Sequence, residues 1–208
     1  MKKTVSCIIA VLSFLVLTFC YSKNVNSSLS HDIVRLHVIA NSDSKEDQLL
    51  KLKVRDAILK HAEVSFTKKS DVKRCLNEYQ AIAENVIEEN GFSYSAVSEY
   101  GNFSFPTKHY GNMSLPAGSY DAVRIKIGQA KGKNWWCVLF PPLCFVDGTT
   151  KADNAAEKLK SSLSDENYDL ITAKYNKSTL PVEIKFKIVE LYGLLCTRDR
   201  VYAKAGKD

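Results

Sequence analysis

The stretch IVRLHVIANSDSKEDQLLKLKVRDAIL, residues 33–59, changes its hydrophobic period part-way along. In its first part, apolar residues alternate with Arg35 and His37, as they do in a half-buried β-strand. Further on, apolar residues recur at helical spacing, which predicts a helix over residues 45–61. The polar run at residues 41–44 predicts the strand-to-helix turn between them, because it offers side chains that cap a helix.

Further along the chain, the same two periods recur. A second helix is expected from Ser70 or Asp71 to Glu89, where asparagine and glycine follow as a C-cap signal. Alternating patterns then predict three strands, at residues 92–105, 120–127 and 134–140. Gly101 suggests a bulge in the first of these strands. Glycines at both ends of the segment before the third strand predict a hairpin that makes the last two strands neighbours.

The order β-α-α-β-β-β predicts one α+β domain over residues 32–147. Two helices are expected to pack on a mainly antiparallel sheet, and residues 107–119, rich in Gly and Pro, are expected to form a loop. Residues 148–208 are a C-terminal extension of different character. A short helix is expected there first and irregular chain from Tyr168, while the apolar run at 182–195 fits a strand as well as a helix.

The N-terminus has the layout of a secretory signal peptide over residues 1–22. Two lysines precede a mostly apolar run, and Cys20 and Ser22 place small residues at the −3 and −1 positions of a possible cut. The run is also just long enough to remain as a membrane anchor. In both cases the polar tether expected at residues 23–31, and the chain after it, lie outside the cytoplasm.

Composition and spacing argue against several functions. The formal net charge of +6 comes mostly from lysines scattered among acidic residues, so no nucleic-acid-binding face is expected, and membrane contact is expected to be transient or through the signal segment. The four histidines and the cysteines show no zinc-site spacing, so no metal site and no cofactor is expected. Because no catalytic motif is visible either, an enzyme is not expected.

A second stretch, NWWCVLFPPLCFVD at residues 134–147, combines adjacent tryptophans with two cysteines around two prolines. Neighbouring residues of a strand face opposite sides, so one of Trp135 and Trp136 can enter the core. The other is either exposed as an anchor for a protein partner or buried under residues 107–119.

The cysteines of this stretch, Cys137 and Cys144, flank the two prolines. An exported protein meets oxidising surroundings, which favours a disulfide between them, contributing about 2–3 kcal/mol. The alternative is two buried free thiols, since free cysteine is among the most buried residues. No pairing is predicted for Cys75 and Cys196.

Two long motifs carry a resemblance to a known family. They are residues 33–59, quoted above, and AGSYDAVRIKIGQAKGKNWWCVLFPPLCFVD at residues 117–147; VEIKFKIVEL at residues 182–191 agrees more loosely. With the signal-peptide layout, they resemble the stage II sporulation protein R family of endospore-forming bacteria. The resemblance implies a signalling protein, not an enzyme. It implies export from the forespore into the space between the forespore and mother-cell membranes.

The resemblance also implies a partner. Proteins of the family trigger a membrane-embedded aspartic protease of the mother cell, stage II sporulation protein GA, which then removes the pro-sequence of sigma-E. The outer domain of that protease is therefore the expected partner. A first candidate contact comprises Trp135, Trp136, Phe140, Pro141 and Pro142. A second comprises Arg35, His37 and Asn41. An exported cell-envelope enzyme or a structural envelope protein is the alternative function.

Overall fold

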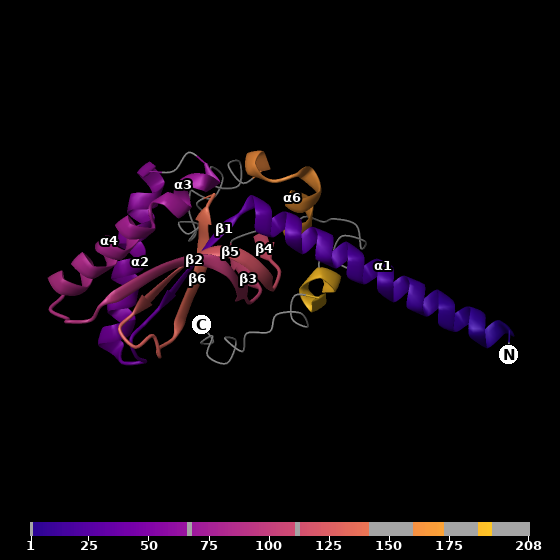
Figure 1. Cartoon of the computed structure of the whole chain (residues 1–208), viewed down its shortest axis with the longest axis horizontal. Helices are drawn as coiled ribbons and strands as arrows, with labels where there is room; N and C mark the ends of the chain where they lie inside the picture. The colour runs from indigo at the N-terminus through magenta and orange to yellow at the C-terminus, as the bar shows by residue number, and fades with distance from the viewer. Residues whose placement is uncertain (1, 66–67, 111–112, 142–159, 173–186, 193–208) are drawn as a thin grey trace.

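A four-stranded sheet in the order β2-β5-β1-β6 forms the middle of the fold in the computed structural model (Figure 1). Its strands are β1 (Val34–Ile39), β2 (Ala96–Phe105), β5 (Gly118–Ile127) and β6 (Asn134–Phe140). A separate hairpin pairs β3 (Lys108–Tyr110) with β4 (Met113–Leu115). The structure describes residues 2–65, 68–110, 113–141, 160–172 and 187–192.

Helices cover both faces of the sheet. They are α1 (Lys2–Asp32), α2 (Lys45–Ser65), α3 (Lys69–Arg74), α4 (Leu76–Glu89) and α6 (Asp165–Thr172). One face packs on α2 and α4; the other packs on the C-terminal end of α1, the β3–β4 hairpin and α6 (Figure 1). The predicted α+β domain is therefore confirmed, with a second covering layer that the sequence pattern did not predict.

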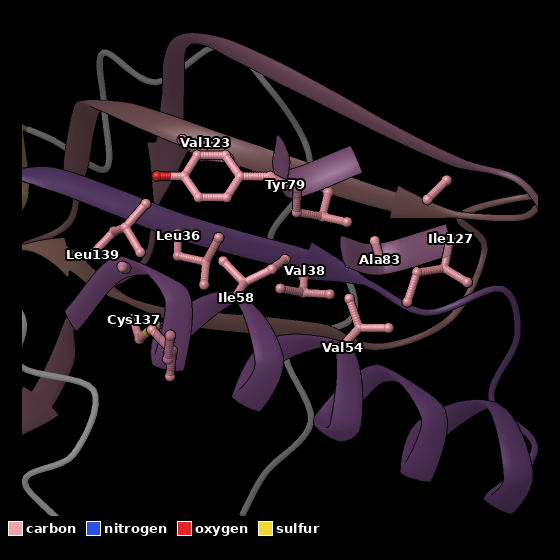
Figure 2. Packing of buried hydrophobic residues seen from close by; sticks show 14 of the residues in the cluster. Leu36, Val38, Val54, Ile58, Tyr79, Ala83, Val123, Ile127, Cys137 and Leu139 are labelled. Carbon is pink, nitrogen blue, oxygen red and sulfur yellow. The ribbon is translucent and has the colours of Figure 1, made fainter. Parts of the chain in front are cut away.

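The helix-side core is formed by apolar residues of the sheet and of α2 and α4. Figure 2 shows Leu36 and Val38 of β1 packed toward Ile58 of α2, with Tyr79 of α4 and Val123 of β5 beside them. All of these side chains are fully buried. The helical period of residues 45–61 thus predicted the helix and the burial of Val54 and Ile58. Leu49, expected on the buried face, is 60% exposed, and Lys51, expected on the other face, is buried.

Strand β1 lies between β5 and β6, so the predicted hairpin of the last two strands is wrong. Strand β1 runs parallel to β5, with Leu36 opposite Val123, and antiparallel to β6, with Leu36 opposite Cys137. Parallel neighbours need a long crossover, which the chain from α2 to β4 supplies. A central strand can hydrogen-bond its backbone N–H and C=O groups to neighbours on both edges. β1 is the most completely buried strand of the sheet, so its backbone groups need such partners in place of water.

The prediction of a half-buried β1 is also wrong. The side chains of Arg35 and His37 are 0% and 1% exposed, because the α1 side of the sheet is covered as completely as the helix side. Alternation of apolar and polar residues normally indicates one wet face. Here it marks two interiors: the helix-side core, and a second core on the α1 side in which Arg35 and His37 lie among aromatic and aliphatic side chains.

Smaller differences from the predicted elements are found along the rest of the chain. Strand β2 pairs with β5 in one continuous register, Gly101 opposite Ala122, so there is no bulge at Gly101. The predicted second helix is divided at Cys75 into α3 and α4. The segment expected as a loop contains the β3–β4 hairpin. In the C-terminal extension, α6 occupies part of the chain expected to be irregular; residues 148–159 and most of 182–195 lie outside the described residues.

Helix α1 continues without interruption from the apolar segment into the domain. The residues expected to form a polar tether are its last turns, and they bury Val25 and Leu29 in the core against α6 and the sheet. A polar composition suggested a tether, but apolar residues four apart lie on one face of a helix. Residues 4–32 form a helix long and apolar enough to cross a membrane, as a signal sequence also is.

Candidate interaction surface around strand β6

Arg35 is the charged centre of the α1 side of the sheet. Its guanidinium lies 4.3 Å from the centroid of the Phe105 ring and donates from Nη2 to the Tyr110 hydroxyl at 2.9 Å. Its Nε donates to the carbonyl oxygen of Cys137 at 3.5 Å. Within the described residues no carboxylate pairs with it, and Nη1 has no hydrogen-bond partner. Aromatic rings and neutral oxygens therefore stabilise this buried cation.

His37 lies in the same layer, against Trp136. The two rings stack with 3.7 Å between centroids, and Nε2 of His37 donates to Oδ1 of Asn134 at 2.8 Å. Burial lowers the pKa of His37 to about 3, although the hydrogen bond to Asn134 raises it, and the nearby Arg124 and Arg35 lower it further. His37 is therefore neutral at physiological pH.

These positions correct part of the predicted contact. Arg35, His37 and Trp136 are 0%, 1% and 6% exposed, so their side chains do not form an outer surface. Of the two interpretations of the tryptophan pair, Trp136 agrees with burial beneath residues 107–119, because its side chain shares a core cluster with Met113 and Leu115. The layer of charged and aromatic residues is an interior that positions β6.

Trp135 and Phe140 remain accessible from outside. Both are half-buried on the helix side, and the guanidinium of Arg55 lies 4.3 Å from the centroid of the Trp135 ring. Arg55 also pairs with Asp56 at 2.6 Å. Strand β6 is an edge of the four-stranded sheet, so Trp135 and Phe140 lie along that edge. Of the prolines in the predicted contact, Pro141 is buried, and Pro142 lies outside the described residues.

Asn41 belongs to a hydrogen-bonded hub instead of a free turn. Its Nδ2 donates to Oδ2 of Asp47 at 2.9 Å, and its Oδ1 accepts from the backbone N–H of Gln129 at 2.9 Å. The hydroxyl of Ser42 donates to the same Asp47 oxygen at 2.5 Å. The side chain predicted to contact a partner is thus engaged at both ends, holding residues 128–133 against the start of α2.

Asp47 is buried at the centre of this hub. Burial alone would raise the pKa of its carboxyl, but hydrogen bonds from Ser42, Asn41 and Tyr94 outweigh burial and lower it. The neighbouring loop approaches so closely that a Cβ on Gly132 would lie 2.1 Å from the carbonyl oxygen of Ser42. The hub therefore joins β1, α2 and the β5–β6 connection in one rigid unit.

Cys137 points into the helix-side core and is disulfide-bonded. Its predicted partner, Cys144, lies outside the described residues, as does Cys196, so the pairing stays a prediction. Cys75 is a free thiol at the break between α3 and α4. It stands beside His61 and Glu78, and these three residues offer ligand atoms that all lie within 4.8 Å of one another.

A pocket of about 370 Å³ lies away from β6, where the end of α1 meets β2 and β5. Its lining is polar: Lys23, Ser27, Ser30, His31, Asn102, Ser119, Asp121 and Tyr192. The hydroxyl of Ser30 accepts from the backbone N–H of Asp121 at 3.2 Å, and Asn102 donates to the Asp121 carboxylate at 3.3 Å. These groups bind one another and hold α1 on the sheet.

Comparison with known proteins decides the family. The family model of stage II sporulation protein R matches residues 30–150, which run from the end of α1 past β6. The chain belongs to the stage II sporulation protein R family. Stage II sporulation protein R of Bacillus subtilis (strain 168) is 35% identical over 219 residues, covering 91% of this chain and 97% of the relative. No solved structure matches the chain.

Membership of the stage II sporulation protein R family gives the chain a role in sporulation, and the predicted resemblance is confirmed. The matched region contains the whole sheet, the Arg35 layer and the Asn41 hub. Sequence reasoning missed Arg55, Tyr110 and Asn134 as partners of the predicted residues. Only Asn134 carried a signal, since it immediately precedes the tryptophan pair.

Proposed function

We propose that this protein is an exported signal that activates the mother-cell protease, stage II sporulation protein GA, and so triggers processing of pro-sigma-E. Membership of the stage II sporulation protein R family is the observation that carries the proposal. The apolar α1 supports it, since a helix of this length and composition directs or anchors a domain outside the membrane that it crosses.

The signal would act by binding, without chemistry of its own. A ligand shifts a protease toward its active arrangement only if it binds that arrangement more tightly than the inactive one. An aspartic protease needs two carboxylates side by side. Binding that brings together or reorients two protease chains from outside the membrane would therefore be sufficient.

We place the contact on the exposed side of β6, around Trp135, Phe140 and Arg55. Strand β6 is a sheet edge, and an edge can accept a strand from a partner. Trp and Arg are the residues that contribute most often to protein contacts, and here a guanidinium lies 4.3 Å from an indole centroid. The buried Arg35 layer and the Asn41 hub would keep this edge rigid, which lowers the entropy lost on binding.

Reconstitution in growing, non-sporulating cells tests the proposal. The protein is expressed together with the protease and pro-sigma-E, and the size of the sigma factor is followed by immunoblot. A chain lacking residues 1–22 controls for export, and a protease with one active-site aspartate replaced controls for its activity. Cleavage that needs both the exported chain and the active protease would support the proposal.

The opposite result is equally informative. If the exported, folded chain leaves pro-sigma-E uncut, direct activation of the protease is wrong. A sporulation defect with normal sigma-E processing would instead indicate a structural envelope protein. Turnover of cell-wall material by the purified chain alone would indicate an exported enzyme.

A further inference from the structure

We propose that His61, Cys75 and Glu78 form a binding site for a divalent transition metal, with Zn²⁺ as its natural ligand. The three residues come from separate parts of the helical layer. His61 lies in the last turns of α2, Cys75 at the break between α3 and α4, and Glu78 in the first turn of α4. Nothing in the proposed signalling function requires this site, so the two proposals stand independently.

The spacing of the donor atoms fits a metal ion. Nε2 of His61 lies 2.9 Å from Oε2 of Glu78, and one ring nitrogen of His61, Sγ of Cys75 and one carboxylate oxygen of Glu78 all lie within 4.8 Å of one another. In a tetrahedral zinc site with bonds of 2.0–2.3 Å, ligand atoms stand roughly 3.3–3.6 Å apart. The side chains therefore need movements of less than about 1.5 Å, which rotamer adjustments at a half-exposed site allow.

The chemistry of the set also fits zinc. Imidazole, thiolate and carboxylate are the three ligand types that zinc takes from proteins. Three protein ligands leave one position for water or for a fourth group. Among the described residues this is the one group of three or more His, Cys, Asp and Glu side chains that meets this spacing.

The surrounding structure positions the ligands. The His61 ring meets the Tyr79 ring edge-on, at 6.1 Å and 90°, and Tyr79 is fully buried. The hydroxyl of Ser65 lies 3.3 Å from Nε2 of His61, a contact that would give way when the metal binds that nitrogen. The backbone N–H of Cys75 donates to Asp71, and its carbonyl oxygen accepts from Tyr79 at 2.9 Å, so the break is firmly held. An ion pair between His61 and Glu78 alone would not require the Cys75 thiol beside it.

Metal binding at these three residues involves no change of oxidation state. Zn²⁺ takes the Cys75 sulfur as thiolate, the thiol proton passes to solvent, and His61 and Glu78 bind through lone pairs. The His61–Glu78 contact is replaced by two bonds to the metal. The result would be a clamp that fixes α2 to the α3–α4 break.

Cobalt(II) titration of the full-length chain tests the site. The metal-free protein, kept without reductant so that the Cys137 disulfide stays closed, is held in detergent micelles and carries Cys7→Ser and Cys20→Ser, because both of those thiols are exposed and could bind metal themselves. We expect one Co²⁺ per chain with a near-ultraviolet thiolate-to-cobalt band, displaced by Zn²⁺, and a higher melting temperature with Zn²⁺. Cys75→Ser should abolish the band, and His61→Asn or Glu78→Gln should weaken binding at least about tenfold.

His31→Asn is the matched control, since His31 is exposed and belongs to no such cluster among the residues that the structure describes; it should leave binding unchanged. Circular dichroism checks the fold of each variant. If Cys75→Ser does not fold, the cobalt affinities of His61→Asn and Glu78→Gln still test the site. A cobalt band that persists in Cys75→Ser, or an affinity unchanged by both other substitutions, would overturn the proposal. Absence of saturable cobalt binding would overturn it as well.

Discussion

The imidazole of His37 lies flat against the indole of Trp136, with 3.7 Å between the ring centroids and 19° between the ring planes. This stack joins the central strand β1 to the edge strand β6 on the α1 side of the sheet. On the other side, Trp135 of the same strand is half-buried against the helix-side core, with the guanidinium of Arg55 4.3 Å from the centroid of its ring. Adjacent tryptophans thus have different roles, one inside and one at the surface.

Replacing the two tryptophans separates these roles. Trp136→Ala removes a buried indole and its stacking on His37, so we expect a loss of about 3–5 kcal/mol in the free energy of unfolding. Trp135→Ala should cost about 1–2 kcal/mol because its ring is only half-buried. Urea unfolding of the chain from Lys23 onward measures both. Equal losses would mean that the two indoles are equally buried.

Acid should destabilise the domain through His37. Its pKa is about 3 in the folded chain against 6.5 when unfolded, so below pH 6.5 the unfolded chain binds a proton that the folded chain does not. Stability should fall with decreasing pH by up to about 1.4 kcal/mol per pH unit, down to about pH 3.

The slope is best measured between pH 6.5 and 5. Below that window Asp47 and Glu99, whose pKa values are lowered in the fold, also lose their stabilising contribution as they take up protons. His37→Phe keeps an aromatic ring against Trp136 and should flatten the curve in this window, while His31→Asn should not. An unchanged slope in His37→Phe would assign the acid sensitivity elsewhere.

Gly132 should tolerate no side chain. A Cβ there would lie 2.1 Å from the carbonyl oxygen of Ser42, and the residue's own N–H donates to Ala40 at 2.9 Å. Because backbone cannot move aside, we expect Gly132→Ala to cost more than about 3 kcal/mol or to prevent folding. Thermal unfolding and yield of soluble protein measure this loss.

Gly91→Ala is the matched control for that substitution. Gly91 has φ of +79°, but an added Cβ would meet nothing within 4 Å, so only backbone strain opposes alanine. The expected cost is about 1–2 kcal/mol. A loss at Gly132 no larger than this would show that residues 128–133 can move away from the hub.

The proposed contact predicts a loss of signalling without a loss of fold. Trp135→Ala and Arg55→Gln should each reduce pro-sigma-E processing several-fold in the reconstituted system, because each removes one member of the half-buried Trp135–Arg55 pair on the β6 side. Val97→Ser is the matched control: Val97 is 47% exposed on β2, the opposite edge of the sheet. Equal effects at both edges, or normal processing in both contact variants, would move the contact elsewhere.

The local pattern of the sequence predicted most helices and strands but not the order of the strands. The change of period after residue 40 indicated β1 and α2, because side-chain spacing reports directly on the local backbone. The insertion of β1 between β5 and β6 depends on contacts a hundred residues apart in the chain. Glycines around residues 128–133 suggested a hairpin, whereas they in fact allow close approach to Ser42 and Asn41.

The candidate site was predictable only in part. The adjacent tryptophans marked β6 correctly, but which of them faces outward depends on what covers each face, and α1 and the β3–β4 hairpin were not expected there. Arg35 and His37 were expected to be accessible because charged residues are seldom fully buried. Aromatic rings and the Asn134 amide make their burial possible, and no spacing rule would have brought these partners together.

If the chain signals from its membrane as proposed, the unbroken α1 also sets how far it can reach. A helix rises 1.5 Å per residue, so the few residues between the apolar segment and the buried Val25 and Leu29 span only a few ångströms. While α1 remains in a membrane, no flexible linker separates it from the domain, so the domain is held against the bilayer in one orientation. It could then contact only receptors whose outer domains come within about one domain diameter of that membrane. Activation would therefore depend on the distance between the two facing membranes.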